Sequence, residues 1–296
     1  MINIVGVSTK VLLDYHTIHP LEKPNLLISY ARLSRDCGDF IFKHRGLIGS
    51  LILDSGTYSL TSNPIKFAAT VTLEGYKSLL RQIGRYFDFY FNFDQDFSRD
   101  GFDVNLANQL ELEQAGLRPV PVVHDCYSDE IRYYIDHGYE MISIGSGELE
   151  KEDVGELYRI IEKPYSQGIK VHLLGCTDYS KLAFLPVYSG DSATFNQAAS
   201  RGNVLYWNPS KPDIDKTERI RFIYGLPRRL MKNHIDNHPN YDEIEDYLNR
   251  ELNYSIEDLK GPRGLSKRLV ANLHYYVQLD KRVAAMHRQL GFRFWT

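Results

Sequence analysis

Cysteine is scarce in this sequence, and the scarcity excludes several kinds of protein. The three cysteines among 296 residues, Cys37, Cys126 and Cys176, lie far apart, and none belongs to a C-x-x-C pair. Their odd number and wide spacing argue against a disulfide framework and against a cysteine-rich zinc site. The sequence therefore favours a protein of a reducing compartment without structural zinc.

Long apolar runs are absent as well. No stretch approaches the roughly 18 apolar residues that indicate a membrane-spanning helix. The first residues, from Met1 to Val7, lack the basic and apolar regions of a secretory signal peptide. These absences predict a cytoplasmic protein without a membrane partner.

Short apolar runs, in contrast, recur along the chain and alternate with segments of helical periodicity. The runs expected to form buried strands cover residues 25–30, 51–53, 87–93, 119–123, 141–144, 169–174 and 185–188. The helix-like segments cover residues 72–86, 105–115, 129–138 and 150–167. About seven or eight such repeats favour an α/β fold of the closed TIM (β/α)8 barrel type. A Rossmann fold is the weaker choice, because no G-x-G-x-x-G follows the first strand.

The pattern changes near residue 212. A connector with two prolines covers residues 208–212, and the sequence after it is helical and charged, with helices expected at residues 242–252 and 266–290. We therefore predict a TIM-barrel catalytic domain at residues 1–212 and a helical, basic appendage at residues 213–296 that packs on the barrel.

Positive charge gathers toward the end of the chain, although the net charge is only -3. From residue 260 onward, Asp280 is the one acidic residue beside the basic residues Lys260, Arg263, Lys267, Arg268, Lys281, Arg282, Arg288 and Arg293. A surface of this kind is typical of proteins that meet nucleic-acid phosphates. The same side chains could also be merely solvated on a helix.

Acidic residues stand at the ends of the expected strands, and Asp54 is the clearest example. It follows the apolar residues 51–53 and precedes a Ser-Gly turn, and Asp94 and Asp191 stand at or beyond the ends of later runs. The C-terminal ends of barrel strands meet at one face, where α/β enzymes place reactive groups. Asp54 could instead serve only as an acceptor for N–H groups of its own turn.

Two carboxylates that face one pocket suit the chemistry of a glycosidic bond. One attacks the anomeric carbon, and the other moves the proton of the leaving group. Asp54 and Asp191 are candidates for this pair, because a barrel would bring both strand ends to the same rim.

Five segments give the chain a resemblance to a known family. They are Asp54-Ser55-Gly56-Thr57-Tyr58-Ser59, Phe93-Asp94-Gln95-Asp96, Ile144-Gly145-Ser146-Gly147-Glu148, His172-Leu173-Leu174-Gly175-Cys176-Thr177 and Gly190-Asp191-Ser192. In this order they resemble the corresponding segments of the tRNA-guanine transglycosylases (queuine tRNA-ribosyltransferases), which are TIM-barrel enzymes that exchange guanine for a 7-deazaguanine. The resemblance covers residues 26–207.

The resemblance implies roles for individual residues. Asp191 would attack C1′ of a target guanosine and hold a covalent glycosyl intermediate, and Asp54 would be the acid/base. Asp94 would accept hydrogen bonds from N1–H and the 2-amino group of a guanine-like base. The remaining base-binding residues would be Tyr58, His124, Gly145, Ser146, Leu174 and Gly175.

One departure from the family bears on the substrate. The tRNA enzymes carry a C-x-C-x-x-C zinc site with a histidine, whereas this chain has no cysteine after Cys176. A zinc-free relative with a basic tail resembles the branch in bacteria and phages that inserts 7-deazaguanines into DNA. This implies DNA rather than tRNA as the favoured partner, a preQ0- or preQ1-like base as the small substrate, no metal or other cofactor, and the cytoplasm of a bacterial or phage-infected cell. The residues expected along the nucleic-acid backbone are Arg201, Lys260, Arg263, Lys267 and Arg268.

Two other hypotheses remain open. His16-x-x-His19 and His234-x-x-x-His238 offer imidazoles to a metal-dependent TIM-barrel hydrolase, although neither pair follows a strand. The other hypothesis is a degenerate relative that only binds nucleic acid and has lost turnover because Thr57 or His124 alters the pocket. The oligomeric state is left open by the sequence.

Overall fold

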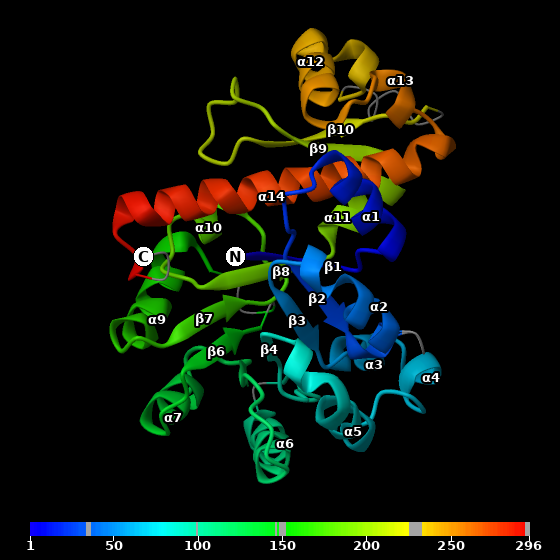
Figure 1. The fold of residues 1–296 in the computed structure, drawn as a ribbon. Coiled ribbons are helices and arrows are strands. Elements are labelled where there is room, and N and C mark those ends of the chain that lie inside the picture. The colour runs from blue at the N-terminus through cyan, green and yellow to red at the C-terminus, as the bar shows by residue number, and fades with distance from the viewer. Residues whose placement is uncertain (34–36, 99, 146, 148–151, 225–232, 294–296) are drawn as a thin grey trace.

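Eight short parallel strands form one curled sheet with helices around its outer side (Figure 1). The computed structural model describes residues 1–296 except 34–36, 99, 146, 148–151, 225–232 and 294–296. The sheet strands are β1 (Ile2–Val5), β2 (Leu26–Ser29), β3 (Leu51–Asp54), β4 (Phe89–Tyr90), β5 (Val122–Val123), β6 (Met141–Ile144), β7 (Lys170–Leu173) and β8 (Ser189–Ser192).

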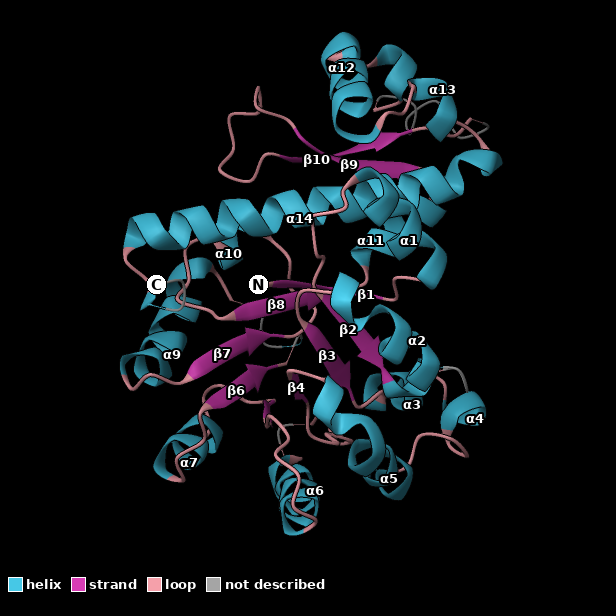
Figure 2. Cartoon of the chain, in the orientation of Figure 1, coloured by secondary structure: helices cyan, strands magenta, loops and turns pink. Residues whose placement is uncertain are grey.

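Most crossovers between these strands contain α-helices, which are drawn in cyan in Figure 2. The helices of this part are α1 (Thr9–Ile18), α2 (Cys37–His44), α3 (Thr57–Ser62), α4 (Pro64–Phe67), α5 (Leu73–Ile83), α6 (Phe102–Gln114), α7 (Glu130–Asp136), α9 (Val154–Ser166), α10 (Tyr179–Leu182) and α11 (Thr194–Ser200). Short 3-10 turns cover Tyr30–Arg32, Arg45–Leu47 and Gly84–Tyr86. Polar side chains cap the N-termini of several helices. At the start of α5, for example, the Thr72 hydroxyl accepts a hydrogen bond from Gly75 N–H.

The strand order β4-β3-β2-β1-β8-β7-β6-β5 brings the first strand next to the last one. The curled sheet has its edges at β4 and β5, which are both only two residues long. One isolated parallel bridge, between Phe91 and Val120, joins these edges. The expected α/β fold with parallel strands is confirmed, but the strand ladder of a closed barrel is not continuous between β4 and β5.

Strand β8 lies later in the chain than the sequence suggested. In the apolar run at residues 185–188, residues 185–187 are buried and Tyr188 is partly exposed, but the run precedes the strand, which covers Ser189–Ser192. Small residues are needed here, because a Cβ on Gly190 would lie 2.5 Å from the carbonyl oxygen of Cys176. Asp191 is therefore within the strand and opposite Asn3 of β1.

The chain after β8 adds a hairpin and a long helix. The hairpin pairs β9 (Asn203–Trp207) with β10 (Thr217–Arg221) across residue 212, and β10 was not expected from the sequence. The helices that follow are α12 (Tyr241–Leu252), α13 (Ile256–Leu259) and the 26-residue α14 (Leu265–Leu290), with 3-10 turns at Ile235–Asn237 and Pro262–Gly264. In Figure 1, α14 runs between the hairpin and the curled sheet, and it contacts α1, α11, β1 and β9.

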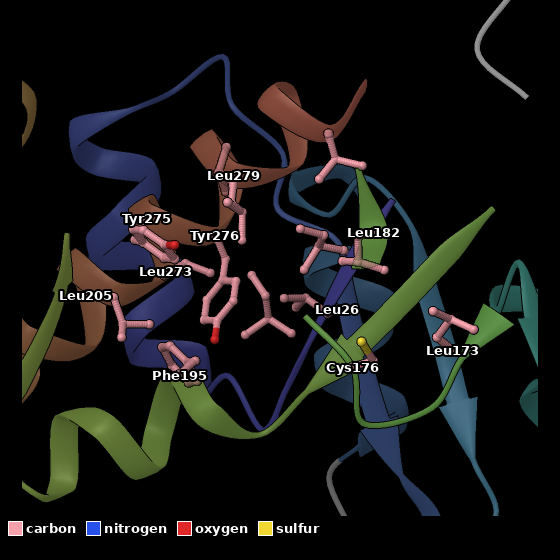
Figure 3. Close-up of a cluster of buried hydrophobic side chains, with 14 of the residues drawn as sticks. Leu26, Leu173, Cys176, Leu182, Phe195, Leu205, Leu273, Tyr275, Tyr276 and Leu279 are labelled. Carbon is pink, nitrogen blue, oxygen red and sulfur yellow. The ribbon is translucent and has the colours of Figure 1, made fainter. Parts of the chain in front are cut away.

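A continuous hydrophobic core holds α14 to the sheet. Figure 3 shows Leu26 of β2, Leu173 of β7, Phe195 of α11, Leu205 of β9 and Leu273 of α14 within one cluster. All five side chains are nearly inaccessible to solvent. Within the part of the chain that the structure describes, no helix has both the length and the apolar character to cross a membrane.

Candidate functional site

Asp54 is the last residue of β3, at the C-terminal edge of the sheet. Its Oδ2 accepts a hydrogen bond of 3.1 Å from Gly56 N–H in the following turn. Gly56 adopts a left-handed φ of 80°, and a Cβ there would lie 2.6 Å from the backbone nitrogen of Ala31, so the turn requires glycine. Burial, with the charges of Asp94 and Asp191, raises the pKa of Asp54 to about 7.

Asp191 is buried in β8, where one of its oxygens is fixed by two partners. Oδ1 accepts from Gly175 N–H at 3.0 Å and lies 3.1 Å from His172 Nε2. The ring of His172 is fully buried, its Nδ1 lies 2.8 Å from Ser189 Oγ, and burial lowers its pKa. The neutral ring therefore donates Nε2–H to Asp191 and accepts from Ser189.

Asp94 is buried just beyond β4 and is held by three side chains. Its Oδ1 accepts from Ser55 Oγ at 3.1 Å and from Thr57 Oγ1 at 3.0 Å, and its Oδ2 lies 3.1 Å from His124 Nε2. A carboxylate offers about four acceptor sites. Three of these sites are occupied, so one acceptor site remains for a ligand. The N1–H and 2-amino donors of a guanine would need two.

His124 directly follows β5, and its ring pairs with Asp94. Burial lowers the pKa of His124, but the hydrogen bond and charge of Asp94 outweigh it, so the net pKa is raised. Gly145, at the end of β6, lies beside the ring, since a Cβ there would be 3.1 Å from His124 Nδ1. The structure thus places His124 and Gly145 side by side, whereas Ser146 lies outside the described residues.

Aromatic side chains extend from this cluster to the surface. Tyr58, at the start of α3, is 72% exposed, and its ring lies edge-on to Phe97 with centroids 6.5 Å apart. Phe97 in turn lies edge-on to His124 at 5.2 Å. Neither Phe97 nor the hydrogen bond from His172 to Asp191 was predicted from the sequence. A histidine inside the apolar run 169–174 was the signal available for the second of them.

A cavity of about 530 Å³ lies between the ends of β7 and β8, the hairpin and α14, and Asp191 itself is not among its lining residues. Leu174 and Gly175 line it, as does Ser192, which follows Asp191. The full lining is Leu174, Gly175, Cys176, Thr177, Asp178, Lys181, Ser192, Thr194, Leu205, Asp215, Thr217, Arg219, Tyr275 and Tyr276. Leu174 also packs against the small apolar cluster inside the curled sheet.

The expected nucleic-acid backbone residues differ widely in their surroundings. Arg201 and Arg263 are exposed, while Lys260 pairs with Asp236 at 2.8 Å and Lys267 pairs with Asp258 at 2.5 Å. The expectation for Arg268 is wrong. Its buried guanidinium donates to the carbonyl oxygens of Ala199, Leu259 and Gly261, so it cannot meet a phosphate.

The histidine pairs lie away from this edge of the sheet. His19, just after α1, stacks on His274 of α14 with centroids 4.5 Å apart, and His238 Nε2 lies 3.1 Å from Glu218 Oε1. Among the residues that the structure describes, no group of three or more His, Cys, Asp or Glu side chains could hold a metal ion.

Comparison with known proteins assigns no family to the chain. Its sequence matches no family model, and it matches no curated protein.

Proposed function

We propose that this chain is a base-exchanging transglycosylase that replaces guanine in nucleic acid by a 7-deazaguanine, with DNA as the favoured substrate. The observation that carries the proposal is the contrast between two carboxylates at one edge of the sheet. Asp54 has a pKa raised to about 7, whereas Asp191 Oδ1 is held by N–H donors from Gly175 and His172. One group is suited to proton transfer near neutral pH, and the other to nucleophilic attack.

In the first half of the reaction, Asp191 attacks C1′ of the target nucleotide through Oδ2. The C1′–N9 bond breaks, its electron pair stays with guanine, and Asp54 supplies the proton that makes the departing base neutral. In the second half, Asp54 takes the proton from N9–H of the 7-deazaguanine. N9 then attacks C1′ and displaces the Asp191 carboxylate, which restores both side chains.

His172 and Gly175 act on this sequence by positioning. Both donate to the same oxygen of Asp191, which orients the carboxylate and leaves Oδ2 toward the reacting carbon. As the covalent ester forms, negative charge on Asp191 is lost. The neutral His172 suits this step, because an imidazolium would stabilise the ionised carboxylate and so oppose attack.

Asp94 and the side chains around it recognise the base. Ser55, Thr57 and His124 fix the carboxylate, and one acceptor site remains for a donor on the base. Exposed Tyr58 and the adjacent Phe97 offer ring faces near this position. A base in a duplex would have to be flipped out to reach these groups. The lack of a cysteine-rich zinc segment supports DNA over tRNA through the family resemblance.

The test is base exchange itself, measured as incorporation of radiolabelled guanine and of 7-deazaguanines into duplex DNA, single-stranded DNA and unmodified tRNA. A protein–DNA adduct that survives denaturation should form with the wild type and vanish in Asp191→Asn. Asp213→Asn, an exposed carboxylate in the hairpin loop, is the matched control and should retain the adduct. Failure of all three nucleic acids to take up any base would refute the proposal.

A further inference from the structure

A second cavity lies outside the curled sheet, among β9, α12 and α14. Its volume of about 560 Å³ is within the roughly 300–1,000 Å³ of small-molecule sites. Figure 1 shows α12 and the hairpin on the side of α14 that faces away from the curled sheet. The residues that line this cavity come from residues 206–210, 240–251 and 274–282, so it is separate from the candidate site at the strand ends.

Aromatic rings and a guanidinium form part of its wall. Tyr206 and Trp207 of β9 and Tyr247 of α12 all line the cavity. The rings of Tyr206 and Tyr247 meet edge-to-face with centroids 5.4 Å apart. Cζ of Arg282, which also lines the cavity, lies 5.0 Å from the centroid of the Trp207 ring. Proteins that bind unpaired bases stack them on aromatic rings and on arginine guanidinium planes.

The fully buried ring of His274 in the same wall carries a nitrogen without a partner. Among the described residues, none forms a hydrogen bond with its Nε2. Burial and the nearby His19 lower the pKa of His274 to about 4, so the ring is neutral near pH 7. The Tyr15 hydroxyl, 3.5 Å from Nδ1, can donate to that atom, and the ring proton is then on Nε2.

Glu251 places an acceptor next to this donor. Its Oε1 accepts from Arg250 Nε at 2.9 Å, whereas its Oε2 lies 3.7 Å from His274 Nε2, which is too far for a hydrogen bond. Nucleobases carry donors and acceptors on neighbouring atoms of one edge. An occupant of this kind can accept from Nε2 and donate to Oε2, so it would satisfy both groups.

The charges of the wall nearly cancel. Three carboxylates and two guanidiniums line the cavity, from Glu243, Asp246, Glu251, Arg250 and Arg282. A phosphate is drawn to a cleft of net positive charge, which this wall does not have. The mixture of donors and acceptors instead suits an uncharged polar ring.

We propose that the cavity among β9, α12 and α14 binds an uncharged nucleobase, with Tyr247 and Arg282 as stacking groups and Glu251 as the acceptor for its N–H donor. The inference does not depend on base exchange, because none of these side chains belongs to the candidate site at the strand ends. A free nucleoside and a single strand of nucleic acid both present this chemistry, and the experiment distinguishes them.

Binding is measured by isothermal titration calorimetry with the four deoxynucleosides, their 5′-monophosphates and a single-stranded oligodeoxynucleotide of mixed sequence. The cavity variants are Glu251→Gln and Arg282→Gln, and neither side chain is fully buried. Their matched controls are Glu245→Gln on α12 and Arg288→Gln on α14, two positions that do not line the cavity.

The wild type should bind at least one deoxynucleoside, and the corresponding 5′-monophosphate should bind no more tightly. Glu251→Gln should weaken this binding about tenfold or more, as expected for loss of a hydrogen bond to a charged group. Arg282→Gln should weaken it at least threefold, and both controls should behave as the wild type. Binding of the oligonucleotide alone, with the same losses in the two cavity variants, would identify a strand as the source of the base.

Three outcomes would overturn the inference: no binding of any deoxynucleoside or of the oligonucleotide, cavity variants that bind as well as their controls, or 5′-monophosphates that bind more tightly than the deoxynucleosides. Absence of base exchange would overturn the proposed function and leave this inference in place, since the calorimetry requires no turnover.

Discussion

Replacement of Asp54 by asparagine tests the electrostatics of the site directly. Asn keeps the size of the side chain and an oxygen that can accept from Gly56 N–H, but it cannot ionise. The pKa of Asp54 is raised from 3.8 to about 7. Between these two pH values, the carboxyl is therefore protonated in the folded protein and ionised in the unfolded chain. Asp54→Asn should abolish base exchange and, at high pH, make the protein more stable.

The size and sign of the stability effect follow from the pKa. The folded pKa of Asp54 exceeds its ordinary value by about three units, and one unit corresponds to about 1.36 kcal/mol, which gives about 4 kcal/mol. Because the side chain is partly exposed, solvent screening reduces the expected gain to about 2–4 kcal/mol. The ionised folded form is the costly one, so the wild type loses stability as pH rises from 3.8 to about 7.

The assay is urea unfolding of the wild type, Asp54→Asn and Asp213→Asn at several pH values between 4 and 8.5. The free-energy difference between Asp54→Asn and the wild type should be near zero at pH 4, grow toward neutral pH and level off above it. Asp213→Asn removes the same charge from an exposed position and should show little dependence on pH. A difference that is constant with pH, or an Asp54→Asn protein that is less stable at pH 8, would refute the reasoning.

Three further substitutions probe neighbouring contacts. His172→Phe keeps a ring but removes the hydrogen bonds to Ser189 Oγ and to Asp191 Oδ1, which keeps Gly175 N–H as its donor, so urea unfolding should show a loss of about 2–3 kcal/mol. Its kcat for base exchange should fall with little change in KM. Asp94→Asn removes the charge that raises the pKa of His124, and an NMR titration should find that pKa lowered. Arg268→Met removes the guanidinium donor from the carbonyl oxygens of Leu259 and Gly261, and from that of Ala199, which still accepts from Gly202 N–H. It should cost about 2–4 kcal/mol in the same unfolding assay, a loss that a phosphate-binding arginine would not show.

Apolar runs predicted most of the sheet because buried parallel strands are apolar on both faces. The runs at residues 51–53 and 141–144 coincide with β3 and β6. The strand predicted at residues 185–188 was wrong, because burial alone does not define a strand. The following small polar residues form β8 instead, in a space too narrow for larger side chains. Strand β10 was missed because its sequence, Thr217–Arg221, is rich in charge and forms a two-stranded sheet with β9 outside the main sheet.

The candidate site was predictable as far as it depends on strand ends. Asp54, Asp94 and Asp191 gather at one edge because parallel strands share a direction, and Asp94 and Asp191 both influence the pKa of Asp54. Contacts set by packing between distant segments were not predictable. The cluster of basic residues in the sequence predicted an exposed Arg268. Its guanidinium instead donates to backbone carbonyls that come together only in the folded chain.

Helix α14 links stability to the candidate site through one row of side chains. Arg268, Asn272 and Tyr276 follow one another at four-residue intervals and therefore lie along the same face of the helix. Arg268 donates to the carbonyl of Ala199 near the end of α11, Asn272 accepts from Leu205 N–H in β9, and Tyr276 lines the cavity near the ends of β7 and β8. A change that loosens this face would disturb the fold and the site together. Asp191→Asn, in contrast, removes the nucleophile and leaves α14 in place, so loss of exchange without loss of the helix contacts would separate the two roles.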